Sequence, residues 1–294
     1  MTGSRIAHVL AVGLVMGVVS PGAAQRLEVT AGWAATLPAS GGRLDSTFAP
    51  VLLVGGTRVA SESTQRLTVD ADAGQGVEVG LDAFPARRMG VHVAFVTARA
   101  DLSGVNAAYR TSLRYISAQP PNGAPAEYAV AQVLPWSATS GWLRTTAVAL
   151  GGVFRTAPGR RVGARVRAGI ELERYSGEIR SLAYTQFVLG GHATLFSVAH
   201  GVAMAPEHGQ TIVRPHLGGD LRLRLTPRVA LVAGLRLTPG SMRRIRTVPA
   251  RLVNPDEASF APGLEDVRAL MGEAALVLPA ARWRTLVGLT LSGG

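Results

Sequence analysis

The sequence predicts an all-β protein: an eight-stranded antiparallel transmembrane up-and-down β-barrel with long extracellular loops, with ten strands as an open possibility. Three observations predict this fold. Apolar and polar residues alternate over eight segments of about 10 residues, the length that a tilted strand needs to cross a bilayer. Short turns between these segments alternate with much longer connections. An apolar N-terminal segment indicates export.

The N-terminus is expected to be a secretory signal peptide at residues 1–24, followed by one outer-membrane barrel domain at 25–294. Arg5 precedes an apolar run at 6–20, and small residues lie at the expected cleavage site after Ala24. A basic start, a short apolar core and small residues at the cut are typical of signal peptides. The alternative is a membrane helix, for which the core is short because a span needs roughly 20 apolar residues.

The alternation is clearest in the stretch LRLRL at 221–225. Successive side chains of a strand point to opposite faces, so the leucines share one face while Arg222 and Arg224 share the other. We expect the leucine face to contact lipid and the arginine face to line a closed lumen, since every backbone group in a bilayer must be paired. Segments of this kind occur at 26–36, 74–84, 90–101, 142–155, 160–174, 211–225, 228–239 and 282–292.

A soluble sheet also alternates, but two features argue against one here. The polar phase mixes charged residues with glycine, and long structureless connections are rare in compact domains. Tight turns at 85–88, 156–160 and 226–228 are expected on the periplasmic side, together with both termini. The long connections, expected outside, span about 37–74, 102–141, 175–210 and 240–281.

Two stretches leave the strand count open. Residues 264–278 follow a helical period but could form a strand, and 194–204 could form another, which would give ten. We prefer eight strands with an extracellular helix in the last connection. Trp33, Trp142 and Trp283 fall near the expected outer strand ends, where an indole ring meets both lipid and water.

The polar faces predict a network of charges that fills the lumen. An eight-stranded barrel encloses little besides side chains, and buried charges persist only when they are paired. The same residues could instead line an ion path or, because arginine exceeds acid, bind an anion. The expected members are Glu28, Glu78, Asp82, Arg165, Arg167, Glu171, Glu173, Arg214, His216, Asp220, Arg222, Arg224, Arg236 and Arg284.

The composition excludes several classes of function. The net charge is +11, but the arginines are spread singly through apolar strands rather than gathered on one face, so nucleic acid is not an expected partner. The chain has no cysteine and therefore no disulfide or thiol chemistry.

No cofactor or metal is expected. The four histidines His192, His200, His208 and His216 recur every eight residues. That spacing places them roughly 26 Å apart along a strand, too far for one zinc ion.

Catalysis is not expected either. Ser197 with His200 and His216 with Asp220 are candidate pairs, but neither forms part of a distinctive motif.

The predicted signal peptide, the eight segments and the glycine-spaced last strand RTLVGLTLSGG together resemble the small bacterial outer-membrane β-barrel proteins of the OmpW-like and OmpX-like group. The resemblance implies a Gram-negative outer membrane, outer-membrane lipid as a partner and a possible extracellular ligand at the loops. It carries over no active-site residue. The expected role is structural or surface interaction without a wide pore. The alternatives are a narrow channel or transporter for small solutes, a lipid-modifying enzyme, and a soluble periplasmic sandwich or calyx.

Overall fold

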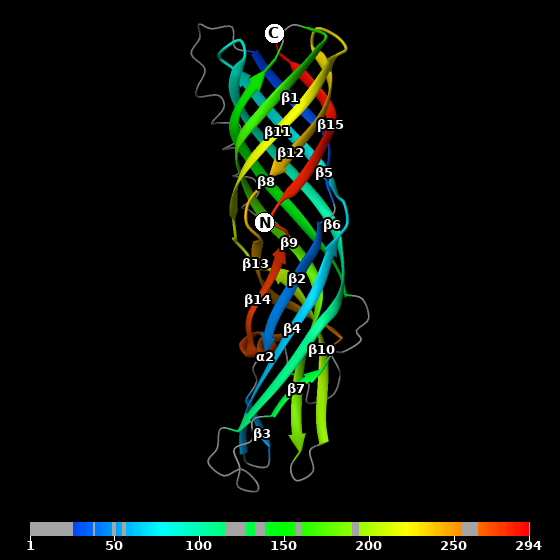
Figure 1. Ribbon diagram of the computed structural model, residues 1–294, viewed down its shortest axis with the longest axis vertical. Coiled ribbons are helices and arrows are strands. Elements are labelled where there is room, and N and C mark those ends of the chain that lie inside the picture. Colours follow the sequence, from blue (N-terminus) through cyan, green and yellow to red (C-terminus); the bar gives the residue numbers. More distant parts are fainter. Residues whose placement is uncertain are drawn as a thin grey trace.

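The computed structural model is a long tube of tilted strands (Figure 1). It describes residues 26–37, 39–48, 51–54, 57–115, 128–132, 139–156, 160–189, 194–254 and 264–293. No helix in this described part is long and apolar enough to cross a membrane. The elements are β1 (Arg26–Thr36), β2 (Ala39–Phe48), β3 (Val51–Val54), β4 (Thr57–Ala71), β5 (Gly74–Phe84), β6 (Met89–Tyr115), β7 (Tyr128–Gln132), β8 (Thr139–Arg155), β9 (Val162–Leu189), β10 (Thr194–Pro206), β11 (Ile212–Arg224), β12 (Val229–Thr238), β13 (Arg243–Asn254), α2 (Leu264–Leu270), β14 (Met271–Leu278) and β15 (Arg282–Ser292).

Eight strands close into a ring at the end of the tube that holds the C-terminus (Figure 1). The order around this ring is β1, β5, β6, β8, β9, β11, β12 and β15, with every neighbouring pair antiparallel. The pairing of β9 with β11 closes the ring, so its backbone groups find partners all round. These are the eight strands that the alternation predicts. The β-barrel prediction is confirmed, although the whole sheet has more strands than the predicted eight. We call the ring of these eight strands the membrane ring.

The prediction that the long connections are loops is wrong. Most of their described residues are strands: β2, β4, β10, β13 and β14 pair with one another and with the outer parts of β6 and β9. With β6, β8 and β9 they close a second ring, the outer ring, beyond the membrane ring. Each connection folds back as a hairpin, and its arms pair with neighbouring arms. This pairing satisfies backbone groups that a bare loop would leave without partners.

Both stretches that left the count open enter the outer ring. Residues 264–278 divide into a short helix, α2, and a strand, β14, so the helix prediction holds for only half of them. Residues 194–204 lie within β10. Because neither strand joins the membrane ring, that ring keeps eight strands although the whole sheet has 15.

The polarity of the wall reverses between the two rings. On the membrane ring the outer face is aliphatic, with Val162, Val213 and Leu221 each more than 60% exposed, while the charged residues point inward. In the outer ring the interior is apolar, and β13 turns Arg244 and Arg246 outward beside the buried Ile245. The apolar interior consists of Leu44, Leu67, Val69, Leu102, Leu143, Ile179, Val202, Met204, Ile245, Ala274, Leu276 and Leu278.

The strands break where the polarity reverses. Pro206 ends β10, Pro239 follows β12 and Pro279 follows β14, and a proline cannot donate a hydrogen bond to a ladder. By contrast, β6 and β9 run unbroken through both rings, with 27 and 28 residues, and the 17-residue β8 enters the outer ring only at its near edge, where Thr139 pairs with Gly104. The strands β6 and β9 therefore hold the two rings in line.

Glycines in the polar phase allow neighbouring strands to approach closely. Gly151 of β8 faces Gly169 of β9 in the ladder. A Cβ atom added to Gly169 would lie 2.0 Å from the carbonyl oxygen of Leu150. The two strands therefore lie so close at this point that only glycine fits, as expected for a cramped, curved interior.

Candidate functional site: the charge network of the membrane ring

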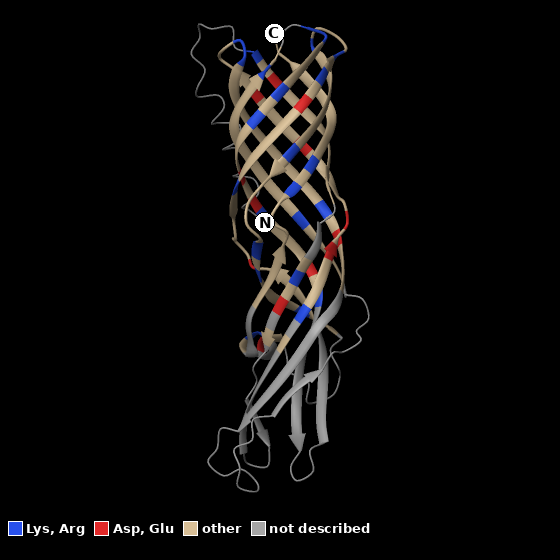
Figure 2. Ribbon diagram, viewed as in Figure 1, with Lys and Arg blue, Asp and Glu red and all other residues tan. Residues whose placement is uncertain are grey.

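The membrane ring gathers the predicted lumen residues inside one narrow tube. Figure 2 shows charged residues interspersed with uncharged ones along its strands. Of the 14 residues named from the sequence, 12 are buried, and Arg222 and Arg224 are partly exposed. Six buried carboxylates face eight buried arginines among the described residues. The interior therefore carries an excess of positive charge.

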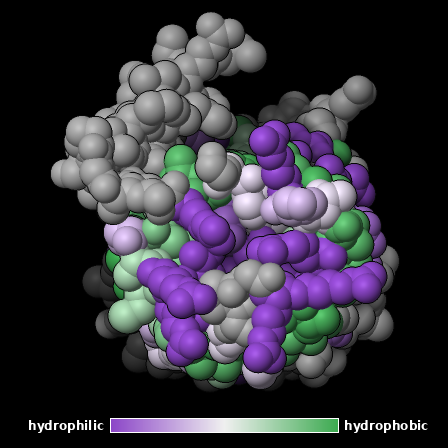
Figure 3. All heavy atoms as spheres, turned by 90° about the horizontal axis from the view of Figure 1, so that it is seen from above, coloured by the Kyte–Doolittle hydropathy of each residue, from purple (hydrophilic) through white to green (hydrophobic). Residues whose placement is uncertain are grey.

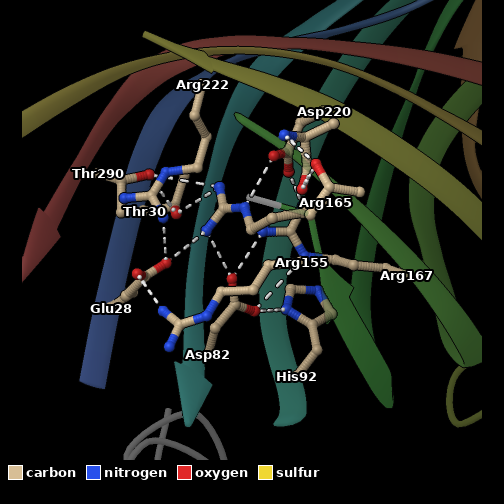
Figure 4. A network of polar contacts seen from close by, with 12 residues as sticks. Glu28, Thr30, Asp82, His92, Arg155, Arg165, Arg167, Asp220, Arg222 and Thr290 are labelled. Carbon is tan, nitrogen blue, oxygen red and sulfur yellow. Dashed lines mark hydrogen bonds and ion pairs between the residues drawn. The ribbon is translucent and has the colours of Figure 1, made fainter. Parts of the chain in front are cut away.

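Arg165 lies at the centre of an inner cluster (Figure 4). Its Nη1 donates to Asp82 at 2.7 Å, and its Nε donates to Asp220 at 2.7 Å. Arg167, two residues along β9, bridges the same two carboxylates, at 2.8 Å to Asp82 and by a hydrogen bond to Asp220. Two arginines thus share two aspartates that come from different strands, β5 and β11.

Glu28 completes the inner cluster near the short turns (Figure 4). Its carboxylate accepts hydrogen bonds from Arg222 at 2.7 Å, Arg155 at 3.1 Å and Arg165 at 3.3 Å. The single negative charge of Glu28 is therefore shared among three guanidinium groups. Charge-assisted hydrogen bonds of this kind are roughly twice as strong as neutral ones.

His92 links the inner cluster to the next layer. Its Nδ1 lies 2.6 Å from Asp82, and its Nε2 lies 3.3 Å from Nη2 of Arg236. A guanidinium group has only donors, so Nε2 must accept and Nδ1 must carry the hydrogen that binds Asp82. This geometry assigns a neutral histidine. The ring of His216 lies edge-on to it, with centroids 6.5 Å apart.

An outer cluster surrounds Glu171 and Glu173 of β9. Arg284 donates to Glu171 at 2.6 Å, and Arg282 donates to Glu173 at 2.5 Å. Arg243 lies 3.4 Å from Glu173, and Tyr175 donates its hydroxyl hydrogen to the same carboxylate.

Arg236 connects the outer cluster to β5. Its Nη2 donates to Glu78 at 2.8 Å, and its Nη1 lies 3.8 Å from Glu171. Glu78 also lies 3.5 Å from Arg284. The inner and outer clusters therefore form one continuous network, which we call the lumen network.

Arg214 joins the network without a carboxylate partner among the described residues. It donates to the backbone oxygens of Ala280, at 2.6 Å, and Ser241. These contacts tie the connections after β12 and β14 to the lumen.

The sequence reasoning missed several members of the network. Arg155 and Arg282 lie on the inward phase of recognised strands, so the alternation could have identified both. The alternation could not identify Arg243, because the long connection that contains β13 is predicted to be a loop. Two further members that the sequence did not identify are threonines. Thr30 and Thr290 form a hydrogen bond with each other at 2.8 Å, and each accepts a hydrogen bond from Arg165 at 3.4 Å.

Of the two candidate catalytic pairs, the structure describes the side chains of His216 and Asp220 alone. His216 and Asp220 are both buried in the lumen, and neither ring nitrogen of His216 has a hydrogen-bond partner among the described residues. Ser197 and His200 lie on β10, but their side chains are outside the described residues. His192, from the histidine series, lies outside them entirely.

A cavity of about 90 Å³ lies at the boundary of the two rings. Tyr175, Arg243 and Arg282 form its polar part, and Leu143 and Leu278 belong to its apolar part. Two more of its lining residues, Leu37 and Trp283, are exposed on the outside of the wall, at 45% and 42%.

A closed antiparallel ring with an aliphatic outer surface and a polar interior is the architecture of a transmembrane β-barrel. The chain is therefore a protein of the outer-membrane β-barrel type. A scan against protein-family models and a search of curated proteins found no match.

Solved structures that match the chain include bacterial outer-membrane proteins. OprG from Pseudomonas aeruginosa matches with 9% identity and a TM-score of 0.42, over 92% of this chain and 97% of that one. Ail of Yersinia pestis, solved with the heparin analogue sucrose octasulfate, matches with 9% identity and a TM-score of 0.35, over 92% and 99%. The outer membrane protease OmpT from Escherichia coli matches with 8% identity and a TM-score of 0.36, over 94% and 99%. Such proteins include the small barrels that the sequence resembles.

Proposed function

We propose that the protein is a non-conducting outer-membrane barrel that acts in surface interaction by holding the outer ring above the membrane. The lumen network carries this proposal. Residues from strands all round the membrane ring meet inside it through short hydrogen bonds, at 2.7 Å from Arg165 to both Asp82 and Asp220. Side chains that fill an eight-stranded barrel leave no wide aqueous path.

The outer ring supports the second half of the proposal. Its interior is packed with apolar side chains, as in a water-soluble barrel, and its outer face carries exposed ion pairs such as Arg43 with Asp45 and Arg251 with Glu178. An element with its own core is rigid enough to present the distal strands β3 and β7 to a partner outside the cell.

Planar-bilayer recording tests the absence of a pore. The purified barrel should give no stepwise conductance at a concentration at which a general porin gives many steps. Reproducible channels in the wild-type protein would contradict the proposal. Two further expectations come with it: the protein should fractionate with the outer membrane, and the folded barrel should change its gel mobility on heating.

The proposal assigns no enzymatic activity to the protein. Expression in a Gram-negative host should therefore leave the mass of lipid A unchanged. A mass change that disappears in a His216→Ala variant would favour the lipid-modifying alternative instead.

The boundary cavity favours a second candidate function, the uptake of small apolar solutes from the side. Trp283 and Leu37 reach both this cavity and the outer surface of the wall. A solute could enter there without crossing the lumen network. Leu143→Trp should fill the cavity and slow uptake of a radiolabelled aromatic hydrocarbon such as naphthalene. Equal uptake by cells with and without the protein would exclude this function.

A further inference from the structure

Arginines surround the end of the membrane ring at which the short turns lie. Figure 3 looks onto this end and shows hydrophilic side chains gathered over it. The exposed members come from the start of β1 and from each of the three turns, so they are distributed around the whole circumference. We call this set the arginine rim: Arg26, Arg87, Arg88, Arg160, Arg161 and Arg228.

The charge of the arginine rim is not balanced. None of the six guanidinium groups forms a hydrogen bond or ion pair with another described residue. Glu28, the acid closest to the rim in the sequence of β1, is buried and already bound by Arg155 and Arg222. The outer ring differs, because its exposed Arg43 and Arg66 both pair with Asp45.

The arginine rim lies at the edge of the aliphatic surface. Arg26, Arg88 and Arg161 are each followed directly by a residue that faces outward. These residues are Leu27, Met89 and Val162, which are 38%, 66% and 61% exposed. A guanidinium group next to the last lipid-facing side chain is at the depth of the lipid headgroups.

A small cavity opens inside the rim between the turn after β8 and the end of β11. Its volume is about 30 Å³, and Arg160, Arg161, Arg222 and Arg224 line it above Glu28. Guanidinium groups bind phosphate through paired N–H donors, with a geometry that a single ammonium group lacks. The cavity therefore concentrates phosphate-binding groups at one position of the rim.

We propose that the arginine rim binds the phosphate groups of anionic phospholipids in the leaflet next to the short turns. The inference rests on the proposed function, since only a barrel that spans a bilayer brings the rim to a headgroup layer. Each arginine near an anionic surface strengthens attraction by about fivefold at moderate ionic strength. Several arginines acting together should therefore select anionic over zwitterionic lipid.

Native mass spectrometry of the full-length folded barrel tests the inference. The barrel is released from nanodiscs containing equal amounts of phosphatidylglycerol and phosphatidylcholine, and the retained lipids are counted. The wild-type protein should retain at least fivefold more phosphatidylglycerol. The combined variant R87Q/R88Q/R160Q/R161Q should retain the two lipids almost equally. The control R43Q/R66Q/R99Q/R246Q removes the same charge from exposed arginines farther from this end, and it should keep the wild-type preference.

Three results would overturn the inference. The rim variant could keep the preference, or the control could lose it to the same degree. Inorganic phosphate, titrated into the lipid-free barrel, could bind at submillimolar concentration and displace phosphatidylglycerol, which would show a free-anion site instead. The change of gel mobility on heating shows whether each variant is folded. A wild-type protein that stays monomeric in water without detergent would contradict the proposed function, and not only the binding of lipid by the arginine rim.

Discussion

Arg165→Met should destabilise the folded barrel by about 3–4 kcal/mol. The side chain of Arg165 is almost fully buried and donates to Asp82 and Asp220, each at 2.7 Å. Methionine fills much of the same space but has no donor. A hydrogen bond to a charged group contributes about 1.5–3 kcal/mol, and the two short bonds to the aspartates are lost together with a longer one to Glu28 at 3.3 Å. Arg167 still bonds to both aspartates, which places the expected cost in the lower part of that range.

Urea unfolding of the barrel in lipid vesicles, followed by tryptophan fluorescence, measures this cost. The matched control is Arg43→Met, which removes an arginine that is 44% exposed and lies 2.8 Å from Asp45. An exposed ion pair of this kind contributes at most about 1 kcal/mol. If the two variants lose equal stability, the lumen network does not stabilise the barrel and the reasoning about buried charge is refuted.

Three further predictions concern the close approach of neighbouring strands, the lipid-facing surface and the closure of the lumen to ions. Gly169→Val should cost about 3 kcal/mol in urea unfolding, because its Cβ would lie 2.0 Å from a backbone oxygen of the facing strand; an unchanged midpoint would contradict the close approach. Val287→Lys, at the centre of β15 on the lipid side, should cost about 2–4 kcal/mol in a bilayer, whereas Arg246→Leu on the outer ring should cost little; similar losses would remove the distinction between the two surfaces. Arg165→Ala combined with Asp220→Ala should produce small conductance steps in planar bilayers, and continued silence would mean that other side chains seal the lumen.

The membrane ring could be predicted because its alternation has a single workable interpretation. In the LRLRL stretch at 221–225, arginine cannot face hydrocarbon, so it must face the lumen once export to a membrane is accepted. The inward direction of Arg165, Arg167 and Glu171 followed from the same parity.

The outer ring could not be predicted because the same alternation has the opposite meaning there. In β13, Ile245 points inward and Arg244 and Arg246 point outward, although the pattern resembles that of β11. Alternation predicts a strand but does not state which medium each face meets. The sequence alone also contains no marker for the level at which water replaces lipid.

The pairing within the lumen network was also beyond the sequence. Arg165 meets Asp82 and Asp220, which lie 83 and 55 positions away in the chain. Which arginine reaches which acid depends on the tilt and stagger of the strands around the barrel. Those quantities emerge only when the ring closes.

The two strands that run without interruption through both rings have a mechanical consequence. A partner that pulls on the far end of β6 or β9 applies tension along the strand axis. The tension is then shared by many ladder hydrogen bonds at once, so they resist shear together instead of opening one after another. Under such a load the two rings remain in line, because β6 and β9 have no break at the level where the polarity reverses.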